Sequence, residues 1–359
     1  MRALLCLALC AAPAATARAQ TVIKFATLAP AGTSWMKVMA ELDKELQTKT
    51  SGRLKFKFYP GGVQGDEKDV VRKIRLGQLH SAGITGVGLG EIAPEVRVLD
   101  SPFLFREAGE VDHVLQEFTP ELERALEAKG FILLGWTEVG FVHVYTASPV
   151  RAPEDMKPLK MWVWEGDPIA EAAYKAFGVQ PRPLALPDVM TSLQTGLING
   201  VYTSHMAAVG LQWFTKTKFI LSVPIAYSAG AVVVSKKLFD SLPEEDRKSL
   251  REVGRKNLEH LTQVGRQENK DALVTLQKQG LKVSDAASPE EMKRYEEAGR
   301  KARRELVGRL YSADLLDRVE RSVEDVRAGR SKGAGEKPAG DSPKPAPRPA
   351  PPSGKIKPN

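Results

Sequence analysis

The chain has 359 residues, which is too long for one compact core and favours at least two lobes. Its formal net charge of +8 arises mainly at the ends of the chain. Residues 1–19 and 331–359 hold eight basic and two acidic residues, which leaves 44 basic and 42 acidic residues in 20–330. This nearly neutral body gives no reason to expect nucleic-acid binding.

Residues 1–19 have the pattern of a secretory signal peptide. Arg2 precedes an apolar run, and Ala17-Arg18-Ala19 provides an A-x-A cleavage site before Gln20. The run is too short to cross a bilayer. Cys6 and Cys10 are the only cysteines, and both lie in this segment, so we expect a mature, periplasmic protein without disulfide or thiol chemistry.

The first part of the mature chain alternates strands and helices. Thr21–Ala26 and Leu54–Tyr59 are predicted strands, and Trp35–Thr50 and Asp66–Leu76 are predicted helices. The segment 80–91 follows and holds four glycines, without the spacing of a P-loop or a complete dinucleotide fingerprint. We predict a strand and a tight turn there, with small residues that let the backbone approach a ligand.

A long helix and two crossing strands come next. Glu110–Ala128 is predicted to be helical, and Phe131–Trp136 and Phe141–Thr146 to be strands, the second entering another lobe. The stretch 159–204 reads as strand, helix, strand, helix, strand. Two such units in about 45 residues predict a parallel sheet covered by helices. In such sheets ligands bind at the carboxyl ends of the strands.

The rest of the chain is mostly helical. His205–Phe214 is a predicted helix, and Lys218–Val223 and Ala229–Ser235 are predicted strands. A helical pattern of roughly 50 Å then begins at Pro243 and ends near Gln279. More helices are predicted to about Arg327. The tail 331–359 is rich in Pro, Gly and Lys and is predicted to be disordered, whether inert or a surface tether.

Several blocks resemble the extracytoplasmic solute-binding proteins of TRAP transporters, the DctP type. They are LAPAGTSW, SGRLKFKFYPGG, IRLGQL, VLDSPFLFRE and SLQTGLING, in the order that the family has them, within about residues 22–325. The resemblance implies an α/β fold of two lobes with mixed sheets and a long helix that spans both. We place lobe I at 20–142 with 229–260, and lobe II with the spanning helices at 143–228 with 261–330.

The same resemblance implies a role in transport. Such a protein captures a small organic ligand in the cleft between its lobes and delivers it to TRAP membrane permease subunits. Some relatives also work with a periplasmic partner made of helical repeats. The alternatives are a sensor-type binding protein and a secreted enzyme. The enzyme is disfavoured because the sequence has no nucleophile elbow, no metal-binding histidine pattern such as H-E-x-x-H, and no cofactor motif.

One position departs from the family. The arginine that grips a substrate carboxylate there aligns with Trp162, which has a single N–H and a large apolar face. Three ligand classes fit: an apolar or amphipathic molecule; a cation near Glu138, Glu165 or Asp167; or an acid, with Arg182, Arg151 or helix N-termini in place of the missing arginine.

Aromatic residues near the expected cleft are the other candidates for ligand contact, although core packing is the usual role of such residues. Thr85 is added for its hydroxyl, and Asn199, where the family usually has Asp, is expected to be a turn residue. The predicted ligand-binding residues are Trp162, Trp164, Trp136, Tyr202, Thr85, Trp213 and Arg182, with Trp35 less favoured.

Overall fold

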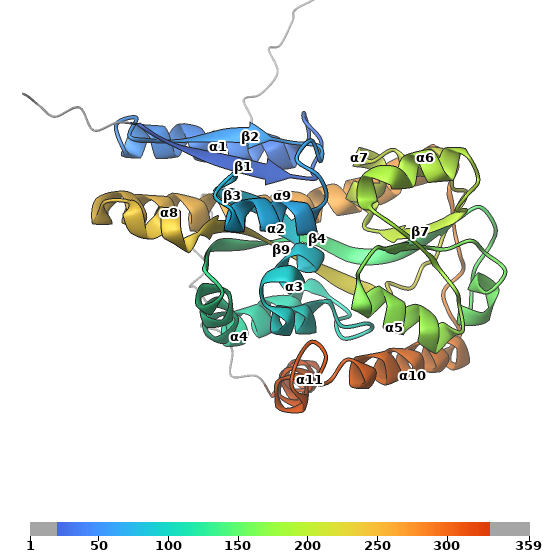
Figure 1. The fold of residues 1–359 in the computed structure, drawn as a ribbon. Helices are drawn as coiled ribbons and strands as arrows, with labels where there is room; N and C mark the ends of the chain where they lie inside the picture. The colour runs from blue at the N-terminus through green and yellow to red at the C-terminus, as the bar shows by residue number, and fades with distance from the viewer. Residues whose placement is uncertain (1–19, 331–359) are drawn as a thin grey trace, which may run out of the picture.

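The computed structural model describes residues 20–330. The predicted signal peptide and the predicted Pro-rich tail lie outside the described residues. Two sheets, joined by long strands, form the centre of the molecule, and helices cover them (Figure 1). Within 20–330, no helix is both long enough and apolar enough to cross a membrane.

The first sheet has the order β2-β1-β3-β9-β4 and defines what we call lobe I. Strands β1, β2 and β3 are parallel, whereas β9 runs antiparallel to β3 and β4. Helices α1, α2, α3, α4 and α8 belong to this half. Their bounds are β1 Thr21–Thr27, α1 Ser34–Lys49, β2 Leu54–Tyr59, α2 Glu67–Arg75, β3 Ser81–Thr85, α3 Gly86–Ile92, η1 Pro94–Asp100, α4 Ala108–Ala128, β4 Phe131–Thr146, β9 Ala226–Ser235 and α8 Lys236–Ser241.

The second half, lobe II, is built on the far end of β4, which pairs with β7 and β8. Strands β5 and β6 are parallel, and Met161 forms a parallel bridge to Gly200, as the predicted βα units require. The bounds are η2 Pro153–Met156, β5 Trp162–Trp164, α5 Pro168–Phe177, β6 Arg182–Leu184, η3 Leu186–Asp188, α6 Val189–Gln194, β7 Gly200–Thr203, α7 His205–Gly210, η4 Trp213–Thr215, β8 Phe219–Ile220 and β10 Lys282–Val283.

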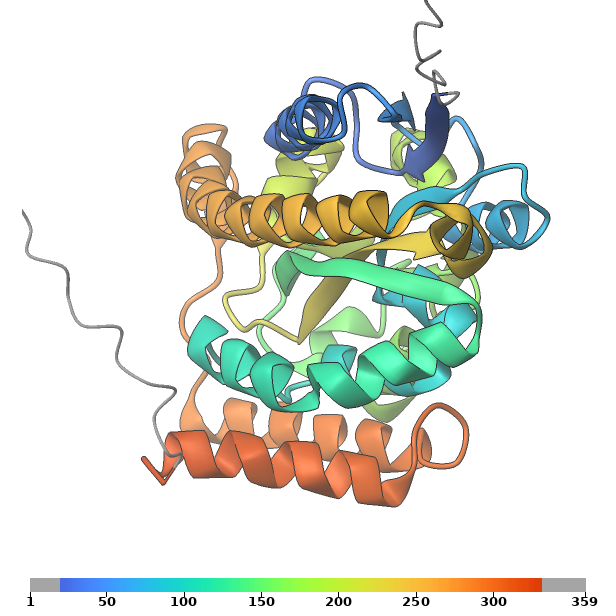
Figure 2. The same cartoon turned by 90° about the vertical axis from the view of Figure 1, so that its left-hand side faces the viewer.

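Three helices connect the halves. Helix α9, Glu244–Lys278, packs on α1 and β4 and continues to α7, which confirms the predicted long spanning helix (Figure 1). Helix α10, Pro289–Glu305, packs on α5 in lobe II, and α11, Ala313–Arg327, packs on α4 in lobe I. Seen from the side, α4 and α9 lie on opposite sides of the sheet, with α10 and α11 beyond α4 (Figure 2).

Apolar clusters lie on both sides of each sheet, which explains why the strands read as nearly continuous apolar runs. The described architecture is the two-lobed, mixed α/β fold that the sequence predicts. We keep the residue boundaries of the lobes as a proposal, since strand pairing alone does not define rigid bodies.

Two segments differ from the predictions. The predicted strands Phe131–Trp136 and Phe141–Thr146 form one continuous strand, β4, whose register with β9 shifts at Leu133/Gly135 and Glu138/Gly140. Gly140 has a φ of +104°, which a non-glycine residue rarely adopts, so the glycine permits the irregularity that we predicted as a break. The tight turn predicted in 80–91 is instead helix α3, capped by Thr85.

The glycines of this segment make room for buried side chains of the protein itself. A Cβ on Gly86 would lie 1.6 Å from Oδ2 of Asp100, and one on Gly88 would lie 2.8 Å from Oε2 of Glu67. Gly83 faces Trp35 in the same way, and Gly90 faces Arg97. The segment is therefore glycine-rich because acidic, basic and aromatic side chains pack directly on its backbone.

Replacing Gly86 with Ala should lower the free energy of unfolding by about 2–3 kcal/mol, because the added methyl overpacks the site. Asp100 cannot easily move aside, since it pairs with Arg97 and accepts a hydrogen bond from Ala229 N. The measurement is the denaturant midpoint at constant m-value. Gly210→Ala is the control, because nothing lies within 4 Å of its added Cβ; an equal loss in both variants would contradict the explanation.

Candidate functional site

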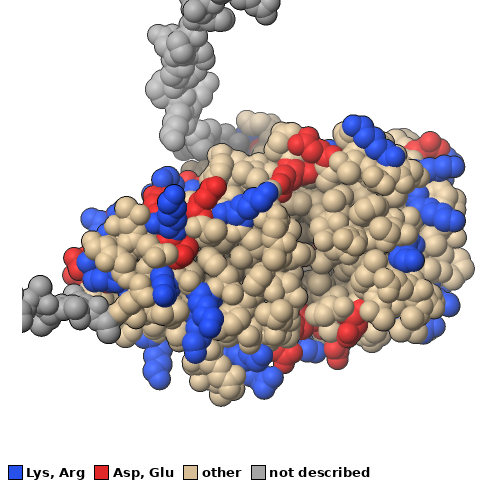
Figure 3. Space-filling model, turned by 90° about the horizontal axis from the view of Figure 1, so that it is seen from above, with Lys and Arg blue, Asp and Glu red and all other residues tan. Residues whose placement is uncertain are grey.

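A cavity of about 620 Å³ lies between the two lobes. Lobe I contributes the loop after β1, the β3–α3 junction, η1 and the middle of β4, and lobe II contributes β5, α5, β7, α7 and η4. Residues of β9 and α9 complete it. From above, the surface is hollowed between the two halves, and most of the surrounding surface is uncharged (Figure 3).

One wall of the cavity is aromatic. The ring of Trp162 stacks on Tyr202 with centroids 4.8 Å apart, and meets Trp213 edge-on at 5.3 Å. The ring centroid of Trp164 lies 6.0 Å from that of Trp162, and both side chains are on the same face of β5, as their spacing predicts. All four residues line the cavity. The wall is thus a packed aromatic cluster, held by lobe II.

The two strand tryptophans have already used their N–H groups. Nε1 of Trp162 donates to the carbonyl of Leu184 at 3.0 Å, and Nε1 of Trp164 donates to Asp66 at 2.9 Å. An indole has only one such donor. These residues therefore offer no hydrogen bond that could replace a guanidinium, and Trp162, which is 1% exposed, presents little ring surface to the cavity.

The other predicted site residues divide into two groups. Thr85 and Trp35 line the cavity, but the Thr85 hydroxyl caps α3 and donates to Glu67 at 2.9 Å. Trp136 does not line it: this residue packs with the lobe I core and donates to Thr119 at 2.8 Å. Arg182 lies on the exposed side of β6, outside the lining. The structure therefore does not bring Trp136 or Arg182 to the cavity, whereas the other predicted site residues line it.

Three further residues named from the sequence, two charged and one expected in a turn, lie outside the cavity lining. Arg151 is exposed and pairs with Asp285, away from the cavity. Glu165 pairs with Lys68 at 3.1 Å and does not line the cavity either. Asn199 accepts a hydrogen bond from Lys160 N at 2.7 Å, which fits the turn role expected for it.

A buried arginine that the sequence analysis did not single out lies at the cavity. Arg97 is 4% exposed, and its Nη2 donates to Asp167 at 2.7 Å. Its Nε lies 2.9 Å from Oδ2 of Asp100, yet makes no hydrogen bond because the contact is poorly aligned. Burial disfavours the cation, but the two aspartates raise the pKa of Arg97 above its usual range. Burial also raises the pKa of Asp100 to about 6, against the effect of Arg97.

Acidic side chains outnumber basic ones around the cavity. Among the described residues that line it, Arg97 is the one arginine or lysine, whereas the acidic residues are Glu67, Asp100, Glu138, Asp167, Glu268 and Asp271. Glu138 is held by Arg266 at 3.0 Å and by the Tyr227 hydroxyl at 3.0 Å. Burial raises the pKa of Glu67 to about 7, although this carboxyl accepts three hydrogen bonds from Thr85 and Gly88.

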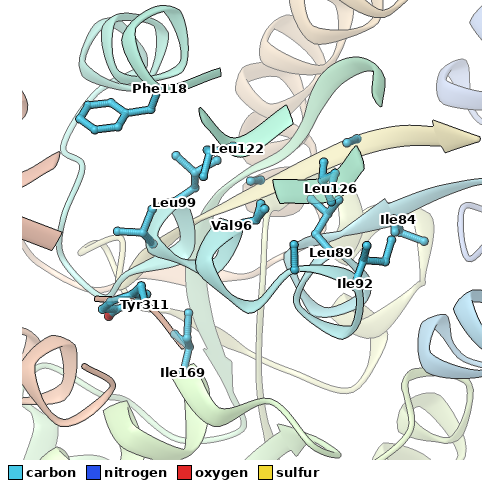
Figure 4. Close-up of a cluster of buried hydrophobic side chains, with 14 of the residues drawn as sticks. Ile84, Leu89, Ile92, Val96, Leu99, Phe118, Leu122, Leu126, Ile169 and Tyr311 are labelled. Carbon is cyan, nitrogen blue, oxygen red and sulfur yellow. The ribbon is translucent and has the colours of Figure 1, made fainter. Parts of the chain in front are cut away.

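Polar contacts also join the two lobes beside the cavity. Asp66 of lobe I accepts from Trp164 Nε1 and from Leu186 N, both in lobe II. Arg97 of lobe I reaches Asp167, which caps α5 of lobe II. Two residues further on, Ile169 inserts into the apolar cluster of lobe I, where it lies with Leu99 and Tyr311 (Figure 4). The lobes are therefore closed on each other along this edge.

The residues that the sequence analysis missed give only a weak signal in the chain. Arg97 lies in the segment EVRVLD, where charged and apolar residues are mixed and a single basic residue reads as a solvent-facing helix position. Its partner Asp167 is 70 positions away. Only the folded chain brings them together. Within residues 20–330, no cluster of three or more His, Cys, Asp or Glu is arranged to hold a metal ion.

A family model described as bacterial extracellular solute-binding protein, family 7, matches residues 25–308. A solute-binding protein of Verminephrobacter eiseniae is 32% identical over 67% of this chain and 72% of its own length. The 2,3-diketo-L-gulonate-binding periplasmic protein of Escherichia coli is 30% identical over 57% of this chain and 63% of its own length.

Solved structures show the same fold. A sugar acid binding protein of Advenella mimigardefordensis in complex with galactonate superposes with a TM-score of 0.80 at 21% identity, over 86% of this chain and 99% of its own. A TRAP periplasmic solute-binding protein of a Polaromonas species, bound to D-erythronate, superposes with a TM-score of 0.77 at 23% identity. The match covers 84% of this chain and 98% of the other. This chain belongs to the DctP family of periplasmic TRAP solute-binding proteins, which serve transport and are not enzymes.

Proposed function

We propose that this protein captures an apolar or amphipathic small molecule in the cavity between its lobes and delivers it to TRAP membrane permease subunits. Strands β4 and β9 cross between the halves and would act as the hinge for opening and closing. The energy for transport would come from the permease. As in the relatives that work with helical-repeat proteins, a periplasmic partner of that kind is part of the proposal.

The observation that carries the proposal is that the described cavity lining offers a ligand no positively charged side chain that is free of an acidic partner. Arg97 is the only Lys or Arg among the described lining residues, and Asp100 and Asp167 already neutralise it. By the family resemblance, Trp162 stands where the arginine that binds a carboxylate is expected, and its N–H donates to the carbonyl of Leu184. A ligand carboxylate would be buried without a free cation beside it, which is costly.

Relatives bind acids: galactonate, D-erythronate and 2,3-diketo-L-gulonate are named with the proteins compared above. An acidic ligand is therefore the first alternative. It would require Arg97 to leave its aspartates, or a carboxylic acid bound in its protonated form. A cationic ligand is the second alternative: Asp167 and Glu138 are already paired with arginines, but Glu268 and Asp271 also line the cavity.

Native mass spectrometry of the mature protein, purified from the periplasm of an expression host, tests the proposal. The bound molecule is released by denaturation and identified in the extract. A lipid or another apolar molecule supports the proposal, and growth of the host on a defined medium guards against a medium component. Recovery of a carboxylic acid such as an aldonate at equal stoichiometry overturns it.

A further inference from the structure

Three buried side-chain atoms have no hydrogen-bond partner among the described residues, and all three belong to residues that line the cavity. They are Thr137 Oγ1, Tyr174 Oη and Arg97 Nε, and the last of these still forms an ion pair with Asp100 Oδ2 at 2.9 Å. A buried polar group without a partner is costly, and such groups are rare in folded proteins. Their coincidence with the cavity indicates that a bound molecule supplies part of the missing hydrogen bonding.

Two of these groups belong to residues on α5 or in contact with it, namely Tyr174 and Arg97. Asp167 is the N-cap of this helix and holds Arg97, and Tyr174 follows seven positions later, on the same face. The ring of Tyr174 is 6.1 Å from that of Tyr202, which in turn stacks on Trp162. The polar groups therefore adjoin the aromatic wall.

The groups at this end act as hydrogen-bond donors. Arg97 can only donate, and burial raises the pKa of Tyr174 and of Tyr202 far enough to keep both phenols protonated. Tyr202 Oη accepts from Trp164 N at 3.1 Å, which leaves its own proton available. No lone positive charge accompanies these donors, because Asp100 and Asp167 balance Arg97.

We propose that Tyr174, Tyr202 and Arg97 form a polar subsite that donates hydrogen bonds to the uncharged carbonyl oxygen of an otherwise apolar ligand. The inference rests on the proposed function and narrows it: the ligand is a ketone, ester or similar neutral acceptor with an apolar body against Trp162. A carboxylate is disfavoured there by the nearby aspartates. An ammonium group is disfavoured because it would meet donors.

The test uses four probes with the same ten-carbon chain: 2-decanone, decane, decanoate and decylammonium. Dissociation constants are measured by equilibrium dialysis on the mature protein after removal of bound molecules by denaturation and refolding. Wild type should bind 2-decanone at least tenfold more tightly than any of the other three. Equal affinity for 2-decanone and decane overturns the subsite, and so does tightest binding of decanoate or decylammonium.

Tyr174→Phe removes one donor from the subsite. The variant should lose most of the preference for 2-decanone over decane, while its affinity for decane stays within about twofold of wild type. Tyr295→Phe is the matched control, because Tyr295 is buried, donates to Arg151 O at 2.9 Å and does not line the cavity. An unchanged preference in Tyr174→Phe overturns the inference.

Thermal unfolding of the ligand-free variants gives a second readout. Tyr174→Phe removes a hydroxyl without a partner and should keep or raise the Tm, whereas Tyr295→Phe breaks a hydrogen bond and should lower it. A lowered Tm in Tyr174→Phe would show that this hydroxyl has a partner within the protein. If none of the four probes binds to folded wild type, the proposal of an apolar ligand is overturned together with the subsite. If decane binds as tightly as 2-decanone, only the subsite is overturned.

Discussion

Replacing Arg97 with Met should lower the free energy of unfolding by about 3–5 kcal/mol, because it leaves two buried aspartates without their cation. Asp100 and Asp167 are 6% and 5% exposed, so water cannot replace the guanidinium. Methionine keeps an unbranched apolar stem and much of the side-chain volume, and the loss therefore reports mainly the charge rather than a cavity.

The loss in free energy of unfolding caused by Arg97→Met should grow as the pH rises. Burial already raises the pKa of Asp100 to about 6 in the presence of Arg97, and removal of the cation should raise it further. A carboxyl whose folded pKa exceeds its unfolded value of about 3.9 stabilises the fold fully at low pH and loses that stabilisation as pH rises. In the variant, the loss of stabilisation by Asp100 continues to higher pH. The difference in free energy of unfolding between wild type and variant should therefore be larger at about pH 8 than at about pH 5.

Urea unfolding of wild type and variant at several pH values measures both effects. Arg309→Met is the control, because its ion pair with Glu171 is 3.6 Å long and exposed; it should change stability by less than about 0.5 kcal/mol. An Arg97→Met protein as stable as wild type at about pH 8 would show that the aspartates are protonated or hydrated without the arginine.

The fold could be predicted from the sequence where the physics is local. Helix α9 follows from a long amphipathic pattern bounded by Pro243 and Gly280, and α10 follows from a Ser288-Pro289 start whose capping box is present in the structure. Lobe II was read from alternating strand and helix signals with glycines at the helix ends. Such signals lie within a few residues of each other and need no tertiary information.

The site was predictable only in part, because its aromatic and charged members behave differently. Trp162 and Trp164 could be assigned to one face from their spacing, and Trp213 and Tyr202 join them in the cavity wall. Trp136 could not be placed, since a bulge in β4 decides which way its side chain points. Asp167 was named only as a carboxylate for a cationic ligand. Arg97 and Asp100 were missed, because the pairing of Arg97 with Asp167 joins segments of both lobes, which no local pattern encodes.

The glycine-rich segment shows how one pattern can mislead. Clustered glycines allow a bulky group to pack directly on the backbone, and a bound ligand is often inferred to be that group. Here the bulky partners are Trp35, Glu67, Arg97 and Asp100, which belong to the protein itself. The pattern predicted the close approach, and Gly83 and Gly86 do line the cavity, but the sequence does not reveal which side chains of the protein pack on this backbone.

Replacing Trp162 with Ala should weaken binding of 2-decanone at least tenfold, or about 1.4 kcal/mol. The substitution removes the central ring of the aromatic wall, on which Tyr202 stacks and Trp213 packs. Because Trp162 is 1% exposed, it should also lower the free energy of unfolding by about 3–5 kcal/mol. The dissociation constant must therefore be measured below the unfolding transition, with circular dichroism to confirm that the variant is folded.

A milder pair of variants separates binding from stability. Trp162→Phe and Trp136→Phe each lose one buried indole hydrogen bond, to Leu184 O and to Thr119 Oγ1 respectively. Only Trp162 lines the cavity, so only its variant should change the affinity for 2-decanone, while both should lose stability. Equal affinities in folded Trp162→Ala and wild type would place this indole in the core alone. The departure from the family's arginine would then say nothing about the ligand, and Arg97 would become the residue on which a carboxylate-binding function rests.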